Sequence, residues 1–378
     1  MTRTLAHGLA ESGHQVRVIG LSRAGESAPD FECDEGVKIW RLSEPAGRFG
    51  WVRGRYELYR KIAHWAHLGL VDLVEVPDYQ GLAAGWPALP VPVVARLHGS
   101  GAYFAVEMGQ KPKWNTALTE RASLRRADYH CSCSRYTADR SAKLFGLRKQ
   151  IEVIYNPVVT PEIHAKVPRS PDRVVFSGTL TAKKGVVSLM RAWNIVSAEA
   201  GGAELHIFGK DGRTAAGTSM KDYLISCLSE QGRKSVHFHG HVDAERLRGA
   251  FRSAGLAVFP SYSEAFALGP MEAMAESCPT IYTSRCSGPE LIQHGENGLL
   301  VDPDAAGEIA RNILRVIGDA NLARELGLAG QKSIEQRFSV PVLVDRNVAF
   351  YEKCVSAHLR SVRKNHLNSS VAQIAQGN

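Results

Sequence analysis

The segment that decides the fold is Gly255–Pro303, GLAVFPSYSEAFALGPMEAMAESCPTIYTSRCSGPELIQHGENGLLVDP. Its first residues form an apolar run that ends at Pro260, which predicts a buried strand. A short loop follows, and we expect a helix to begin near Gly269–Pro270, because proline suits the first helical turn. Glu264 lies in the loop and Glu272 in the expected first turn, with seven residues between them. A strand, a loop and a helix in this order indicate a ligand site at the carboxyl end of a parallel strand.

The chemistry of this loop favours a ligand that carries both phosphates and hydroxyl groups. The free N–H groups in Phe266–Pro270, where proline itself has none, and the positive end of the helix favour a phosphate. Two carboxylates beside that anion would repel a bare phosphate, but they accept hydrogen bonds from vicinal hydroxyls. A nucleotide-diphosphate sugar has both features. In the alternative interpretation, Glu264 and Glu272 are two solvated acids near a helix start, and the spacing alone does not decide between the two.

Strand-like runs recur along the whole chain, separated by helical stretches. Runs that are apolar on both faces and alternate with helices indicate parallel, doubly wound sheets. The first series is Gln15–Gly20, Val37–Leu42, Val71–Val76, Val91–Leu97, Tyr129–Cys133 and Ile151–Tyr155. The second series is Arg173–Gly178, Glu204–Gly209, Ser235–Gly240, Gly255–Pro260 and Pro279–Thr283. Two such series in 378 residues predict an α/β protein with two Rossmann-like, doubly wound domains.

The predicted first domain covers residues 1–165 and the second covers 166–345, with the boundary in the proline-rich stretch Pro157–Pro171. We expect residues 346–365 to form a helix that returns to the first domain, and 366–378 to form a loose tail. The chain opens with a helical pattern, Thr4–Glu11, directly before the strand-like run Gln15–Gly20. A doubly wound domain normally begins with a strand in the middle of its sheet. The first domain is therefore expected to lack its first strand.

Composition excludes general disorder and favours an anionic partner. Hydrophobic residues make up 44% and charged residues 22% of the chain, as in ordinary globular proteins. The 46 Lys and Arg exceed the 38 Asp and Glu by 8, and 6 of this excess lies in residues 1–170. No uncharged apolar run reaches the roughly 18 residues of a membrane span, and the start lacks the apolar core of a signal peptide. Seven cysteines spread through a long chain do not indicate a disulfide framework, so a cytoplasmic protein is expected.

The stretch Arg48–Lys61, RFGWVRGRYELYRK, interleaves basic and aromatic side chains. This mixture fits an anionic membrane surface or a phosphate-bearing acceptor, and it also fits nucleic acid. No nucleic-acid motif accompanies it, so we expect no nucleic-acid partner and a location in the cytoplasm, with peripheral binding at the inner face of the cell membrane as an added expectation. A solvated amphipathic helix remains the alternative.

Two patterns could suggest a metal site. Cys131 and Cys133 are too closely spaced for a zinc knuckle and have no second pair, so they are expected in a buried strand. His237, His239 and His241 alternate along one predicted strand and would share a face. Gly240, between His239 and His241, disfavours a metal site formed by these histidines, and no metal site is expected.

The run SYSEAFALGPMEAMAESCPTI, followed by SGPELIQHGENGLLVDPD, resembles the donor-site signature of glycosyltransferase family 4. These are retaining enzymes of the E-x7-E type with the GT-B fold. Further motifs of the family follow in order: RLHGS (Arg96–Ser100), VVFSGTLTAKKGV (Val174–Val186), HIFGKDG (His206–Gly212) and VHFHGHVDAERL (Val236–Leu247). The resemblance runs from about His7 to Tyr351. It implies two Rossmann-like domains that face a central cleft, with the acceptor on the first and the donor on the second.

The resemblance also implies roles for individual residues. Lys184 would neutralise the leaving diphosphate, Glu264 would bind the donor sugar, and His98 would lie across the cleft; these three are the candidate catalytic residues. Glu272 would bind the ribose hydroxyls. The other candidate donor-binding positions lie in the surrounding loops: Gly178, Thr179, Lys183, Gly240, His241, Val242, Phe266, Ala267, Leu268, Gly269 and Glu290.

The implied reaction is a front-face sugar transfer with retention, with no protein nucleophile, no cofactor and no metal ion, because Lys184 and the helix end supply positive charge. The implied acceptor is a glycan or a lipid-linked molecule in surface polysaccharide or glycolipid synthesis. One departure is Thr179, which stands where the family has an arginine, so Lys183 is expected to compensate as a point charge. A non-catalytic sugar-nucleotide-binding or scaffold subunit is therefore the alternative. An epimerase of the same fold is a further one, but no acid/base constellation for it is found.

Overall fold

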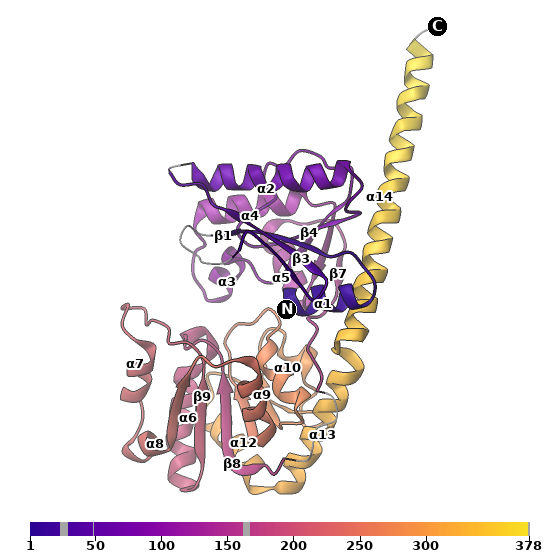
Figure 1. Cartoon of the computed structure of the whole chain (residues 1–378). Coiled ribbons are helices and arrows are strands. Elements are labelled where there is room, and N and C mark those ends of the chain that lie inside the picture. The colour runs from indigo at the N-terminus through magenta and orange to yellow at the C-terminus, as the bar shows by residue number, and fades with distance from the viewer. Residues whose placement is uncertain (23–28, 48, 162–166, 377–378) are drawn as a thin grey trace.

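The computed structural model describes residues 1–22, 29–47, 49–161 and 167–376, the last thirteen of these by their backbone only. Two α/β halves lie one above the other, and the long C-terminal helix runs along both (Figure 1). The predicted boundary between residues 165 and 166 falls in 162–166, outside the described residues.

The second half contains one parallel sheet of six strands in the order β10-β9-β8-β11-β12-β13. Its strands are β8 (Ser170–Ser177), β9 (Glu204–Phe208), β10 (Val236–Gly240), β11 (Ala254–Phe259), β12 (Thr280–Thr283) and β13 (Leu299–Val301). Counted within this half the order is 3-2-1-4-5-6, which is the doubly wound arrangement, and the predicted fold is confirmed. The order reverses between β8 and β11. Sheets of this kind bind ligands outside the carboxyl ends of the strands at that point.

Helices cover both faces of this sheet because its strands are apolar on both sides, and β11 is buried at every position. They are η1 (Ala182–Lys184), α6 (Val186–Glu199), α7 (Met220–Ser226), α8 (Glu230–Ser235), α9 (Ala244–Ser253), α10 (Leu268–Ala275), α11 (Gly288–Leu291), α12 (Ala306–Gly318) and α13 (Ala320–Arg337). Fully buried aromatic side chains such as Trp193, Phe176 and Phe251 fill the core. A rigid sheet thus supports the loops at its carboxyl edge.

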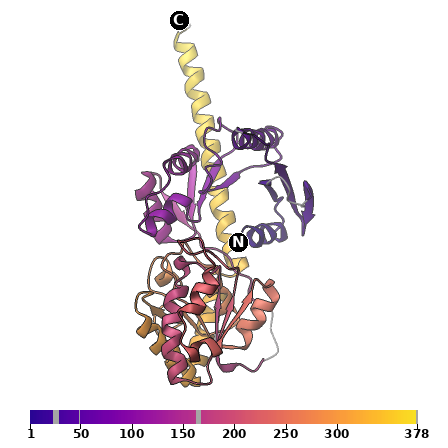
Figure 2. The same ribbon diagram turned by 90° about the vertical axis from the view of Figure 1, so that its left-hand side faces the viewer.

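The described strands of the first half form two sheets (Figure 2). One, ordered β1-β3-β2, contains β1 (Arg17–Ser22), β2 (Phe31–Asp34) and β3 (Val37–Ser43), with β2 antiparallel. The other, ordered β4-β5-β6-β7, contains β4 (Val74–Pro77), β5 (Val93–Leu97), β6 (Tyr129–Ser132) and β7 (Ile151–Val153). Within the described ranges, β1 and β4 each have a strand neighbour on one side only. That the domain lacks its first strand stays a prediction.

Helices accompany both sheets of the first half, and one of them, between β3 and β4, links the two sheets along the chain. They are α1 (Thr2–Glu11), α2 (Gly50–His67), α3 (Gly101–Glu107), α4 (Trp114–Arg126) and α5 (Arg135–Phe145). Leu58 and Ile62 of α2 belong to one apolar cluster that also takes in Leu21 of β1 and Val76 of β4. The two sheets therefore share a core under α2. In the part of the chain that the structure describes, no helix is both long and apolar enough to cross a bilayer.

The last helix, α14 (Val340–Gln376), contacts the first half. Arg96, which is buried in β5, forms a bidentate ion pair with Glu75 at 2.8 and 2.9 Å. The same guanidinium donates to Asn347 Oδ1 at 2.5 Å and to Tyr351 Oη at 3.0 Å. These contacts join α14 to the middle of the first half's parallel sheet.

The expected loose tail from residue 366 is wrong for the described backbone, which stays helical to Gln376. Neither glycine nor proline occurs between Ser361 and Gln376, so no residue there ends the helix.

Candidate active site

Two loops meet at the point where the strand order of the second half reverses. The first follows β8 and contains η1, and the second follows β11 and contains Glu264. Gly185 ends η1 with a φ of +70°, and a Cβ at this position would lie 1.7 Å from the carbonyl oxygen of Pro260. The Tyr262 N–H also donates to the carbonyl oxygen of Lys183 at 2.8 Å. Only glycine permits this close approach. The turn that contains Lys183 and Lys184 therefore packs directly against the end of β11.

The approach brings Lys184 and Glu264 together. Lys184 Nζ lies 2.6 Å from Glu264 Oε1. The side chains are 25% and 8% exposed, so the carboxylate is nearly buried while the ammonium still meets solvent. A ligand anion that reaches this loop therefore meets a cation that is already in place.

Side chains of the first half hold the Glu264 loop. Ser134 Oγ and Thr137 Oγ1 both donate to the Ala265 carbonyl oxygen, at 2.7 and 3.1 Å. Asn156 Nδ2 donates to the Phe266 carbonyl oxygen at 3.1 Å. The sequence analysis missed these three residues, because only the folded chain brings them to the loop. They fix the backbone at Ala265 and at the predicted donor-binding position Phe266.

The helix after this loop begins one residue earlier than expected. It starts at Leu268 with Ala267 as its N-cap, so Gly269 and Pro270 are its second and third residues. Glu272 is therefore its fifth residue rather than part of the first turn, which is a correction. Proline fits the third position because the N–H groups of the whole first turn lack partners inside the helix. Burial raises the pKa of Glu272, and the positive Met1 amino group opposes this shift.

Three glycines line the carboxyl ends of β8, β9 and β10. The Gly178 N–H donates to Phe208 O at 2.9 Å, and the Gly209 N–H donates to Gly240 O at 2.7 Å. A Cβ on Gly209 would lie 2.0 Å from Gly178 O, so a side chain is excluded there. Gly240 has a φ of +70° with open space around its Cβ position. This glycine row gives a ligand access to backbone.

The other predicted positions around this row differ in exposure. Thr179 and His241 are exposed, and Val242 is half-buried against the core. Lys183 is not directed into solvent: its ammonium lies 3.7 Å from the ring centroid of Phe104 in α3. Burial lowers the pKa of Lys183. The structure therefore engages Lys183 in a cation–π contact with the first half, and its compensating role for Thr179 stays a prediction.

His98 approaches the same loop from the first half. The buried Asp78 accepts hydrogen bonds from the N–H groups of His98 and Gly99, at 3.0 and 3.1 Å. A Cβ on Gly99 would lie 3.2 Å from Cβ of Ala265, so this turn contacts the Glu264 loop directly. Burial, assisted by the neighbouring Arg96 charge, lowers the pKa of His98 to about 4. The imidazole is therefore neutral near pH 7.

Asp78 was not predicted, although it lies only two residues after the strand-like run that ends at Val76. An acid at the carboxyl end of a parallel strand was the available signal. Burial raises the pKa of Asp78 to about 7. The hydrogen bonds from the N–H groups of His98 and Gly99 lower this pKa, but burial has the larger effect.

Glu290 has contacts of a different kind from those expected. Its carboxylate accepts from the N–H groups of Arg135 and Tyr136 at 2.7 and 2.8 Å, and from Tyr155 Oη at 3.2 Å. These N–H groups lie in the first turn of α5, so Glu290 stabilises that helix end and links the two halves. Support of a donor phosphate by Glu290 stays a prediction.

Two further features lie outside this group. Asp302 and Asp304 form an Asp-x-Asp spacing of the kind that binds metals in other proteins, but both pair with Arg285, at 2.6 and 2.5 Å. A cavity of about 700 Å³ lies between α1 and the β1-β3-β2 sheet, and no predicted site residue lines it. The structure thus brings together Lys184, Glu264 and the His98 turn, with the glycine row beside them.

Comparison with protein families agrees with this geometry. Residues 160–333 match the family described as Glycosyl transferases group 1, and residues 1–161 match Glycosyltransferase Family 4. The chain is a glycosyltransferase with the GT-B fold. It belongs to the family-4 type, as the two matches together span residues 1–333.

The similarity to known relatives and solved structures covers most of the chain. An uncharacterized glycosyltransferase of Methanocaldococcus jannaschii is 25% identical, and the match covers 92% of each chain. The sucrose-phosphate synthase of Thermosynechococcus elongatus has a TM-score of 0.77 at 21% identity, covering 94% of this chain and 93% of that one. Anabaena HepE, solved in complex with UDP and glucose, has a TM-score of 0.68 at 15% identity, covering 89% of this chain and all of that one. Both structures show the same fold.

Proposed function

We propose that this protein transfers a sugar from a nucleotide-diphosphate sugar to a glycan or lipid-linked acceptor, with retention and without a metal ion. The observation that carries the proposal is the Lys184–Glu264 pair, placed where the strand order reverses and faced by the His98 turn. Family membership supports glycosyl transfer itself. The donor, the stereochemistry and the acceptor class are argued from the residues.

In the proposed reaction, the diphosphate of the donor lies at Lys184 and at the start of α10. Negative charge develops on the diphosphate as the glycosidic bond breaks, and a preorganised cation lowers the free energy of that transition state. The donor would draw Lys184 away from Glu264. The carboxylate of Glu264 would then accept hydrogen bonds from the sugar hydroxyls.

His98 has the properties of a neutral hydrogen-bonding group. With its pKa lowered to about 4, it does not carry a proton near pH 7 and is not a general acid there. We propose that its imidazole bonds a hydroxyl of the donor sugar from across the cleft. Retention then follows from front-face attack. The acceptor oxygen bonds to the anomeric carbon on the side from which the diphosphate leaves, and the acceptor's hydroxyl proton passes to the departing diphosphate oxygen.

The nucleoside would extend along the glycine row. Glu272 is half-buried, and its carboxylate would accept from the ribose hydroxyls, while the turn of Gly240–Val242 would hold the base. The UDP and glucose named for the Anabaena structure are consistent with this arrangement.

The acceptor is proposed to bind the basic first half at the cytoplasmic face of a membrane. Arg48 is outside the described residues, but the rest of the predicted surface stretch falls largely on α2. Trp51 and Tyr56 are 47% and 60% exposed, and Arg53 and Arg60 are exposed beside them. Exposed aromatic rings with cations are typical of proteins at anionic lipid surfaces. Surface polysaccharide or glycolipid synthesis fits such a location.

Donor turnover tests the proposal. Purified protein is incubated with UDP-, GDP- and ADP-sugars and with glycan or lipid acceptors in excess chelator, and release of the nucleoside diphosphate is measured. We expect one donor to be turned over, and NMR of the product to show the donor's anomeric configuration. Binding of a donor without turnover on any acceptor would instead favour the non-catalytic subunit, and an inverted product would contradict the mechanism.

A further inference from the structure

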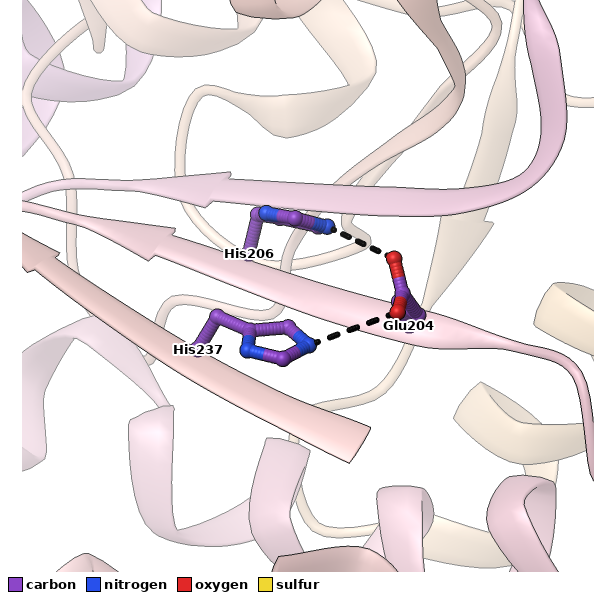
Figure 3. A group of neighbouring side chains, drawn as sticks. All are labelled: Glu204, His206 and His237. Carbon is purple, nitrogen blue, oxygen red and sulfur yellow. Dashed lines mark hydrogen bonds and ion pairs between the residues drawn. The ribbon is translucent and has the colours of Figure 1, made fainter. Parts of the chain in front are cut away.

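A cluster of histidines and one glutamate lies on β9 and β10, outside the candidate active site. We propose that Glu204, His206 and His237 bind one divalent transition-metal ion, with zinc as the best fit. Each of the three side chains offers one possible ligand atom, and these atoms all lie within 4.8 Å of one another. Among the described residues, no other group of His, Cys, Asp or Glu side chains converges in this way. Figure 3 shows the carboxylate of Glu204 facing both imidazoles, which come from neighbouring strands.

The strand register produces this convergence. His206 and His237 are direct partners across the parallel β9–β10 pair. Glu204 precedes His206 by two residues, so its side chain is on the same face of β9. The sequence analysis placed His237 with His239 and His241, but the second imidazole of the cluster comes from the adjacent strand. His241 lies beyond the end of β10 and is exposed.

The distances are close to those of a metal site. His206 Nε2 lies 3.3 Å from one oxygen of Glu204, and His237 Nε2 lies 3.6 Å from the other. Tetrahedral zinc bonds of about 2.0–2.1 Å place neighbouring ligand atoms about 3.3 Å apart. Two imidazoles and one carboxylate are a known zinc ligand set, with a fourth position left for water. Small side-chain movements would therefore complete the geometry.

One imidazole nitrogen of the cluster makes no hydrogen bond within the described part of the chain, and an ion would give it a bond. Nε2 of His237 is shielded from solvent and makes no hydrogen bond to any described group, although 41% of the side chain is exposed. Its distance of 3.6 Å to Glu204 Oε1 is too long for a hydrogen bond. A shielded polar atom without a hydrogen bond is costly, and a metal ion would satisfy its lone pair.

His239 orients the other imidazole. His206 Nδ1 lies 2.9 Å from His239 Nε2, and the two rings are stacked with an interplanar angle of 6°. With Nδ1 donating to His239, the Nε2 lone pair of His206 points at the cluster. Metal-bound histidines commonly use the second nitrogen in this way. His239 is itself fixed by stacking on Phe208, with ring centroids 4.4 Å apart.

The neighbouring cation Arg173 makes a hydrogen bond outside the cluster. Arg173 of β8 is the register partner of Glu204. Its guanidinium donates to Ser253 Oγ at 3.3 Å. Glu204 thus pairs with the imidazoles in this structure.

An ion here would join β10, the edge strand of the sheet, to β9. The β9–β10 register is irregular between Phe238 and Gly240, directly before the turn proposed to hold the donor base. Glu204 is at the amino end of β9, away from Lys184 and Glu264 at the carboxyl edge. The proposed ion is therefore structural and takes no part in sugar transfer.

Zinc binding to the full chain tests the site, with protein that carries no histidine tag and has been freed of metal by chelator. Equilibrium dialysis against zinc chloride, followed by elemental analysis, is expected to give one bound zinc per chain. Binding should raise the melting temperature of the wild type as zinc is added. Cobalt should give the strong visible absorption of a tetrahedral site.

His206→Ala and His237→Ala are expected to weaken zinc binding by at least about tenfold, and His239→Ala by about tenfold through lost orientation of His206. Glu204→Gln, at a half-exposed carboxylate, is a second ligand variant that should fold normally. His241→Ala is the matched control and should bind zinc like the wild type. The proposal is overturned if the wild type binds no zinc, if the His206→Ala/His237→Ala double variant binds it equally well, or if cobalt gives only the weak spectrum of octahedral coordination.

Discussion

Lys184 Nζ and Glu264 Oε1 lie 2.6 Å apart, across the point where the strand order of the second half reverses. The two residues come from loops that follow adjacent strands, and Gly185 allows those loops to touch. In the ligand-free protein the charge of each residue is paired with the opposite charge of the other. A donor must therefore separate them, and both charges become available to the ligand when it does.

Replacing Lys184 tests its role in catalysis. Lys184→Ala removes the cation proposed to stabilise the leaving diphosphate, so we expect kcat to fall by roughly 10²–10³-fold. Release of nucleoside diphosphate measures this rate. Lys234→Ala is the control, because Lys234 is 74% exposed and pairs with Glu230 on the surface. A Lys184→Ala variant that keeps the wild-type kcat would show that another group carries the charge.

The same pair predicts a coupling in stability. Lys184→Ala leaves the carboxylate of Glu264, which is only 8% exposed, without its cation. Loss of one partner should lower the free energy of unfolding by about 1–3 kcal/mol. Adding Glu264→Gln removes the uncompensated charge. The double variant should therefore lose less unfolding free energy than the sum of the losses in the Lys184→Ala and Glu264→Gln single variants. Urea denaturation of the four proteins measures the coupling, and strictly additive losses would argue against the pair.

Asp78 predicts a pH dependence. Burial raises its pKa to about 7 in the folded protein, above the usual unfolded value near 3.9. The folded state then binds the extra proton between about pH 4 and 7, so stability falls as the pH rises through this window. The slope for this one group reaches at most about 1.4 kcal/mol per pH unit.

Asp78→Asn removes that titration. Compared with the wild type, the variant should lose less unfolding free energy between pH 4 and 7, although it loses one N–H acceptor in the His98 turn. Denaturation curves over this range measure the difference. Parallel pH profiles for the two proteins would show that Asp78 stays ionised when buried.

Arg96 connects α14 to the first half. Arg96→Met leaves Glu75 and Asn347 without their shared donor, and we expect a loss of about 3 kcal/mol in unfolding free energy. Hydrogen exchange should also quicken in the segment around Asn347 and Tyr351. Arg148→Met is the control, because Arg148 is exposed on the first half. Unchanged exchange in α14 would contradict the assignment.

The exposed face of α2 predicts lipid binding. Trp51→Ser and Tyr56→Ser should weaken binding to vesicles that contain phosphatidylglycerol, and added salt should weaken the wild type as well. Leu328→Ser is a matched control, because Leu328 is 57% exposed on α13. Cosedimentation measures binding. Equal binding of the wild type and the two variants would show that the exposed face of α2 is an ordinary solvated helix surface that does not bind lipid.

Much of the second half could be predicted from the sequence because its signals are local. Apolar runs predicted five of its six strands, all except β13, and the Glu264–Glu272 spacing marked the loop at the reversal of strand order. Contacts made over long distances in the chain could not be predicted in this way. The Phe104 ring beside Lys183 and the α5 end beside Glu290 depend on how the halves meet. The hydrogen bonds from His98 and Gly99 to Asp78 depend on the pairing of β4 with β5.

The His206–His237 pair shows the same limit. A single strand displays its own alternation, but the partner across a parallel pair depends on register, which the spacing of residues along the chain does not reveal. Likewise, the start of α10 shifted by one residue because Leu268 and proline can both occupy a first helical turn.

The central claim is that the donor diphosphate binds at Lys184, and nucleotide affinity tests it most directly. Calorimetric titration with UDP, GDP and ADP identifies the nucleoside diphosphate that the wild type binds best. We predict that Lys184→Ala binds this nucleotide at least about tenfold more weakly, a change of about 1.4 kcal/mol, while Lys234→Ala binds it like the wild type. Equal affinity of wild type and Lys184→Ala would contradict the account.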